Sequence, residues 1–188
     1  MKQLLLITSC FLLLTSAVYA EPVVEMKTSM GTIQIELNSF KAPLTVKNFL
    51  EYIDQKFYDE TIYHRVIRNF MIQGGGFDRN DKRKEPQSPI KNEAANGLKN
   101  KKGSIAMART GVVDSATSQF FINLVDNDSL NHRGTASRTF GYAVFGQVVA
   151  GMDVVEKIGK VKTIAKSAQF RNYPEQQVII ESIRRIEK

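Results

Sequence analysis

The middle of the sequence alternates between short apolar runs and turn-forming residues. The apolar runs lie at residues 61–67, 70–73, 103–108, 119–124 and 142–149. Runs of this length bounded by Gly, Asn and Asp are typical of strands, because a helix in a folded domain usually needs about 10 residues or more. Two further strands are predicted within residues 23–37, around the turn Ser29-Met30-Gly31, and a last one at residues 178–186. This many short strands favours an all-β barrel or sandwich.

Two segments have helical spacing instead. Pro43 is suited to a first helical turn, and apolar residues recur at helical spacing from there to residue 55. A short second helix is predicted at residues 152–158. Several strands, such as Phe120-Phe121-Ile122, do not alternate between apolar and polar residues, so we expect them to be buried on both faces. These patterns by themselves predict a single β-rich domain.

The N-terminus has the layout of a secretory signal peptide. Lys2 supplies a positive charge, residues 4–14 are mainly apolar, and Val18-Tyr19-Ala20 places Val and Ala at the usual positions before a cleavage site. An uncleaved membrane anchor is the alternative, but the apolar run is shorter than the roughly 20 residues that span a bilayer. We therefore predict a signal peptide at residues 1–20 and one domain at residues 21–188.

Composition argues against several kinds of site. Cys10 is the only cysteine and lies in the predicted signal peptide, so the mature chain has no disulfide and no thiolate chemistry. His64 and His132 are far apart in the sequence and have no cysteine partner, so no metal site is expected. The formal net charge is +7, but the basic clusters at residues 79–84 and 99–102 lie among Asn, Asp and Gly without interleaved aromatic residues. We expect solvated loops there and no nucleic-acid binding.

Three segments carry a more specific pattern. The first is YHRVIRNFMIQGG at residues 63–75, the second combines GSIAMA at 103–108 with SQFFIN at 118–123, and the third is GYAVFGQV at 141–148. In order and separation they closely resemble the cyclophilin family of peptidyl-prolyl cis-trans isomerases, with the closest likeness to its bacterial periplasmic branch. The resemblance implies a mainly β fold, a closed eight-stranded antiparallel barrel capped by two α-helices. It also implies a groove for an Xaa-Pro segment and a reaction without metal or cofactor.

The chemistry of such a reaction suits two of these residues. Rotation about an amide bond meets a barrier of about 18–20 kcal/mol, because the nitrogen lone pair is delocalised into the carbonyl. At the twisted transition state the lone pair returns to the proline nitrogen, so a donor aimed at that nitrogen stabilises the transition state selectively. Arg65 matches the family's catalytic arginine, and a guanidinium offers a planar fork of permanently charged donors. Gln73 matches the glutamine that would hold the substrate backbone.

The resemblance assigns nine further residues to substrate binding. They are Phe70, Met71, Phe121 and Leu130, which enclose the proline ring; Ala108 and Arg109, at the edge where the substrate backbone docks; and His64, Gln119 and Tyr142. For His64 a structural hydrogen-bonding role beside Arg65 is the alternative. Two positions depart from the family pattern, since Ser129 stands where many members have Trp and Tyr142 where many have His.

The function predicted from the sequence is therefore peptidyl-prolyl isomerisation during the folding of exported proteins, in the periplasm or outside the cell. The expected partners are proline-containing unfolded or flexible polypeptides, with no membrane association after signal cleavage, and the expected state is a monomer. The rival hypothesis is a peptide-binding chaperone that uses the same groove with little turnover. The two hypotheses differ in whether Arg65 accelerates bond rotation.

Overall fold

The computed structural model describes residues 20–186, so the predicted signal peptide lies outside the described residues apart from its last position. The strands of the main sheet are β1 Val23–Thr28, β2 Gly31–Leu37, β3 Thr61–Ile62, β4 Arg65–Ile67, β5 Met71–Gly74, β6 Ser104–Met107, β7 Phe120–Asn123, β8 Val144–Ala150 and β11 Ile179–Ile186. They pair antiparallel in the order β3-β11-β1-β2-β8-β6-β7-β5-β4. The strands predicted from the short apolar runs are confirmed.

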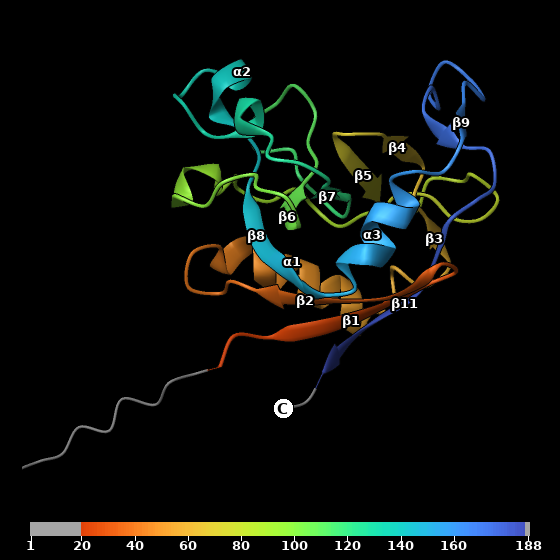
Figure 1. The fold of residues 1–188 in the computed structure, drawn as a ribbon. Coiled ribbons are helices and arrows are strands. Elements are labelled where there is room, and N and C mark those ends of the chain that lie inside the picture. Colours follow the sequence, from red (N-terminus) through yellow and green to blue (C-terminus); the bar gives the residue numbers. More distant parts are fainter. Residues whose placement is uncertain (1–19, 187–188) are drawn as a thin grey trace, which may run out of the picture.

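The sheet is a curled, open half-barrel of nine strands, which corrects the expected closed barrel of eight (Figure 1). The extra strand arises because the extended segment 61–67 is interrupted at Tyr63 and His64, and contributes β3 to one edge of the sheet and β4 to the other. At the interruption the Tyr63 N–H donates to the Val178 carbonyl (2.9 Å). Within residues 20–186 no ladder joins β3 to β4, so the two edges are connected by the chain itself.

The described residues contain three α-helices rather than the expected two: α1 Pro43–Asp54, α2 Ser137–Phe140 and α3 Met152–Ile158. Helices α1 and α3 lie where the spacing predicted them. Helix α2 is a single turn, too short to produce apolar periodicity in the sequence. For the same reason the sequence did not indicate the 3₁₀ turns η1 Ala94–Asn96 and η2 Asp128–Leu130, or the small sheet of β9 Thr163–Ile164 and β10 Tyr173–Pro174. Each of the helices in the described part of the chain is too short or too polar to cross a membrane.

The main core lies in the curl of the sheet against α1. Phe49 of α1 is fully buried, and its ring is 5.6 Å from that of Phe120 on β7 and 5.1 Å from that of Phe145 on β8, measured between centroids. Helix α1 also contacts β11, and α3 contacts β2. All four residues of β7 are buried, which confirms the expectation that this strand is covered on both faces. One face of β6, β7 and β8 thus belongs to the core, and the other is available for a site.

Candidate active site

The register of the sheet brings five side chains into one row on that second face. Arg65 on β4 lies opposite Gln73 on β5, and Gln73 lies opposite Phe121 on β7. The row continues from Phe121 to Ala106 on β6 and from Ala106 to Val144 on β8. Directly paired residues point to the same side of a sheet. The strand order therefore places a charged group, an amide and three apolar side chains side by side.

Hydrogen bonds join the polar members of this group into a chain. The Arg65 guanidinium donates to Gln73 Oε1 (3.1 Å), and Gln73 Nε2 donates to Gln119 Oε1 (3.0 Å). Partial burial lowers the pKa of Arg65, and the nearby Tyr142 opposes that shift. Arginine nevertheless keeps its proton in proteins, so the site holds a fixed cation. Because the amide of Gln73 is held from both sides, the direction of the guanidinium is set before any ligand arrives.

A hollow of about 200 Å³ opens beside this chain. It is lined by nine residues, all predicted from the sequence: Arg65, Phe70, Met71, Gln73, Ala108, Arg109, Phe121, Leu130 and Tyr142. Gln119 lies just outside the lining and reaches it through Gln73. Gln73 is eight positions after Arg65 in the sequence and Tyr142 is 77 positions after it, so only the fold brings them together.

His64 lies elsewhere. It precedes β4, and its buried ring packs edge-on against Phe77 with 4.7 Å between centroids, in the cluster of Ile62, Phe77, Phe170 and Tyr173. Its Nδ1 atom is buried without a hydrogen-bond partner in the described structure. Burial, together with the positive charge of Arg65, lowers the pKa of His64 to about 4, so the ring is neutral at pH 7. The structure thus sets His64 apart from the other predicted groove residues.

The apolar floor of the hollow includes residues that the sequence did not single out. Met71, Ala106, Phe121 and Val144 form a buried cluster, and Leu98 packs against it. Ala106 and Val144 belong to motif segments, but an alanine and a valine in a strand are ordinary core residues. Their place beneath the groove follows from pairing across β6, β7 and β8, which a single sequence does not display.

A buried network of asparagines, also not predicted, holds the two ends of the groove. Asn127 Nδ2 donates to Asn123 Oδ1 (2.7 Å) and to the Phe70 carbonyl (2.8 Å), and Asn100 Nδ2 donates to the Leu130 carbonyl (3.2 Å). These contacts fix the backbone of two residues that line the hollow. The concentration of Asn and Asp at residues 123–131 was the available signal, but such residues are equally common in solvated turns.

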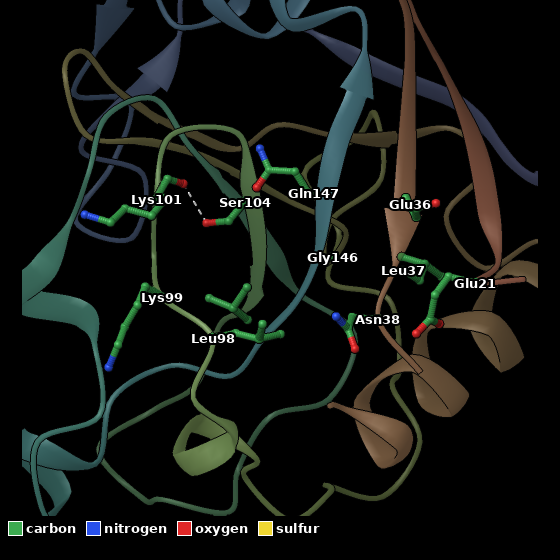
Figure 2. A pocket seen from close by; sticks show the side chains of 11 residues that line it. Glu21, Glu36, Leu37, Asn38, Leu98, Lys99, Lys101, Ser104, Gly146 and Gln147 are labelled. Atoms are coloured by element: carbon green, nitrogen blue, oxygen red, sulfur yellow. Dashed lines mark hydrogen bonds between the residues drawn. The ribbon is translucent and has the colours of Figure 1, made fainter. Parts of the chain in front are cut away.

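The lining of a second hollow, of about 220 Å³, includes Leu98 and Val144, which belong to the apolar cluster beneath the first hollow. Figure 2 shows the side chains around it, with the carboxylates of Glu21 and Glu36 toward one side and the ammonium groups of Lys99 and Lys101 toward the other. It contains none of the residues that the sequence predicted. Among residues 20–186 no group of three or more His, Cys, Asp or Glu side chains is placed to hold a metal ion.

Comparison with known proteins agrees with this geometry. Residues 23–185 match the family described as cyclophilin type peptidyl-prolyl cis-trans isomerase/CLD. A peptidyl-prolyl cis-trans isomerase from Acinetobacter baylyi is 56% identical over 173 residues, which cover 92% of this chain and 89% of that protein. Peptidyl-prolyl cis-trans isomerase B from Escherichia coli is 54% identical over 160 residues, covering 85% of this chain and 97% of that protein.

Solved structures show the same fold. The crystal structure of a cyclophilin type peptidyl-prolyl cis-trans isomerase from Cryptosporidium parvum matches with a TM-score of 0.73 at 25% sequence identity, covering 89% of this chain and 99% of that one. A second structure of that protein, determined in the presence of the dipeptide Ala-Pro, matches with a TM-score of 0.72. Sequence, fold and the arrangement around Arg65 agree, and the chain belongs to the cyclophilin-type peptidyl-prolyl cis-trans isomerase family.

Proposed function

We propose that this protein catalyses the cis-trans isomerisation of X-Pro bonds in exported polypeptides, with Arg65 as the catalytic donor. The observation that carries the proposal is the Arg65 guanidinium, held by Gln73 at the rim of a hollow that also has apolar walls. None of the ion pairs among residues 20–186 involves Arg65. Its charge is therefore available to the proline nitrogen of a bound substrate.

The hollow supplies the second requirement, which is to hold the proline ring while the preceding carbonyl rotates. Phe70, Met71, Phe121 and Leu130 give it apolar walls. Burial of a medium-sized apolar group contributes about 1.5–3 kcal/mol, enough to anchor a ring but not to hold a product tightly. The Cryptosporidium parvum relative was crystallised in the presence of Ala-Pro, which supports a proline-containing ligand for this groove. Gln73 and Gln119 are placed to hold the substrate backbone.

Substitution of Arg65 tests the catalytic role. Arg65→Ala should lower the turnover of an Ala-Pro peptide by roughly 30- to 1000-fold, or about 2–4 kcal/mol of barrier, as for other single preorganised donors. Peptide affinity should change little, since the pyramidal nitrogen exists only near the transition state. Arg65→Lys should also fail, because a flexible ammonium lacks the planar fork. Phe121→Ala should instead weaken binding, because the ring wall acts in both states.

The measurement is NMR exchange for turnover and NMR titration for affinity, with circular dichroism to confirm folding. Arg138→Met is the matched control, because Arg138 is an exposed arginine on α2 outside the hollow. If folded Arg65→Ala keeps more than about a third of wild-type turnover, the donor role is wrong, since a threefold change is under 1 kcal/mol. Peptide binding by the wild type without turnover would favour the chaperone hypothesis.

Export is the second part of the proposal, and it places the working enzyme in the periplasm or the medium as a monomer. It is supported by the layout of residues 1–20, which is that of a secretory signal peptide. Intact mass of the exported protein should correspond to a chain beginning at Glu21, and light scattering should give the mass of one such chain. A secreted chain that retains residues 4–14 would contradict the predicted cleavage.

A further inference from the structure

Arg109 is the second cation of the hollow, and its hydrogen bonds are directed into the protein. Its Nε donates to the Gly141 carbonyl (2.9 Å), one terminal nitrogen to the Thr110 carbonyl (2.9 Å) and the other to the Ser137 carbonyl (2.7 Å). A guanidinium has five N–H groups, and these contacts use donors on all three nitrogens. Arg109 therefore joins the loop after β6 to α2 and to the residue before Tyr142.

The face of the same guanidinium covers an aromatic ring of the groove wall. Arg109 Cζ lies 4.9 Å from the centroid of the Tyr142 ring. The Tyr142 ring meets Phe121 edge-on, with 5.6 Å between centroids and an interplanar angle of 81°. The Tyr142 N–H donates to the Leu130 carbonyl (3.0 Å). Arg109, Tyr142 and Phe121 thus form a continuous row of contacts along one wall of the hollow.

We propose that Arg109 is a positioning residue, which sets the Tyr142 ring against Phe121 and so fixes the width of the proline groove. This inference rests on the proposed function and changes the role that the sequence suggested for Arg109, which was to dock the substrate backbone. The three carbonyl acceptors surround a planar group, and a lysine has neither the fork nor the flat face to replace it. Arg109 acts on the substrate through Tyr142.

A double-mutant cycle distinguishes positioning from direct contact. The variants are Arg109→Met, Tyr142→Leu and the double substitution, measured in the exported chain with an Ala-Pro peptide by NMR exchange. Arg109→Met should raise KM about fivefold to tenfold and change kcat less than twofold, because the wall binds ground state and transition state alike. The double variant should be no worse than Tyr142→Leu alone, because Arg109 has no effect once the ring is absent.

Two further readouts follow the ring and the chemistry of the side chain. In Arg109→Met the NMR chemical shifts of the Tyr142 ring protons should change and become motionally averaged, because the edge-on contact with Phe121 loosens. Arg109→Lys should behave like Arg109→Met, and it carries the test if the methionine variant does not fold. Arg138→Met, on the short helix α2 whose Ser137 carbonyl accepts from Arg109 but outside the hollow, should leave both the kinetics and the Tyr142 signals unchanged.

Additive effects in the cycle, or a raised KM with unchanged Tyr142 signals, would overturn the proposal and show that Arg109 contacts the substrate directly. Full rescue by Arg109→Lys would also overturn it, because charge alone would then suffice. If the proposed isomerase function is itself wrong, the experiment gives a different result, because the wild-type chain would then show no Arg65-dependent turnover.

Discussion

Two neighbouring residues, His64 and Arg65, receive opposite environments from the sheet. Successive residues of an extended chain point to opposite faces, so one side chain enters the groove and the other the cluster around Phe77 and Phe170. Arg65 keeps its charge at the rim of the groove, whereas His64 is buried and neutral. Arg65 thus has an uncharged neighbour at neutral pH.

Burial of His64 predicts a loss of stability in mild acid. Its pKa is about 4 in the folded chain and about 6.5 when unfolded, so the unfolded state takes up the proton first as the pH falls. The stability that the neutral His64 contributes is fully present above pH 6.5 and is lost as the pH falls. At pH 4 the unfolding free energy is lower by roughly 3 kcal/mol for this reason.

Urea unfolding of the wild type and of His64→Gln between pH 4 and 7 measures this difference. Because other groups titrate in both proteins, the quantity of interest is the wild-type value minus the variant value at each pH. That difference should fall as the pH is lowered through this range. A pH-independent difference would mean that the folded protein accepts a proton on His64 without cost.

At the level of elements, the groove depends on the junction between α2 and β8. Gly141 lies there with a φ of 83°, and a Cβ at this position would lie 2.6 Å from the His132 nitrogen. Its carbonyl accepts hydrogen bonds from Arg109 (2.9 Å) and from Asn92 (3.3 Å). A left-handed residue packed against backbone therefore positions the ring of Tyr142, the next residue along the chain.

Gly141→Ala should consequently destabilise the protein more than alanine at a positive-φ glycine that has open space around it. Gly97 is the comparison, because it is left-handed with a φ of 88° and a ψ of −14°, and a Cβ there would meet nothing within 4 Å, whereas Gly141 combines its φ of 83° with a ψ of −167°. Gly97→Ala should cost about 1–2 kcal/mol, the usual penalty for this conformation. Gly141→Ala should cost more than about 3 kcal/mol, since backbone atoms must also move. Thermal unfolding of both variants checks the order, and equal losses would show that the junction can relax.

At the scale of the whole molecule, β11 ties the two ends of the described chain together. It pairs with β1 near the N-terminal end and with β3 at one edge of the sheet (Figure 1). Its inward residues Ile180 and Ile183 are fully buried, whereas Arg184 and Arg185 pair with Asp59 and Asp54 at the surface. Burial should contribute far more than these ion pairs, which are exposed to solvent and to salt.

Substitutions at one buried and one exposed position of β11 test this balance. Ile183→Ala should lower the unfolding free energy by about 2–5 kcal/mol, through lost burial and the cavity it leaves. Arg185→Ala, two residues along the same strand, should lower it by less than about 1 kcal/mol, and high salt should reduce the difference further. Urea unfolding at low and high salt measures both. A larger loss for Arg185→Ala would mean that the surface pairs hold the strand.

The sequence was sufficient for most of the local elements and, through the family resemblance, for the nine residues that line the hollow, but it assigned His64 to the groove, where the structure does not place it. Helix α1, the β1–β2 hairpin and the strands at 61–67 and 119–124 follow from apolar period and turn residues, which act over a few neighbours. The motif segments identified the residues around the hollow because the resemblance supplied positions that already belong to one surface. Short elements such as α2 and β9 were missed, because they contain too few residues to show a period.

Only the tertiary structure determined how the strands pair into one open sheet and which groups accept hydrogen bonds from the long side chains. The segment 61–67 divides between the two edges of the sheet, and at the division Tyr63 donates to the Val178 carbonyl, more than a hundred residues away, a pairing that is not visible within a strand. The Arg109 guanidinium is long enough to reach a substrate or the protein, and it bonds to the carbonyls of Ser137 on α2 and of Gly141 just after that helix. Backbone preferences are local energies and can be read from neighbouring residues, whereas pairing partners, burial and polar contacts depend on every segment that the fold brings near.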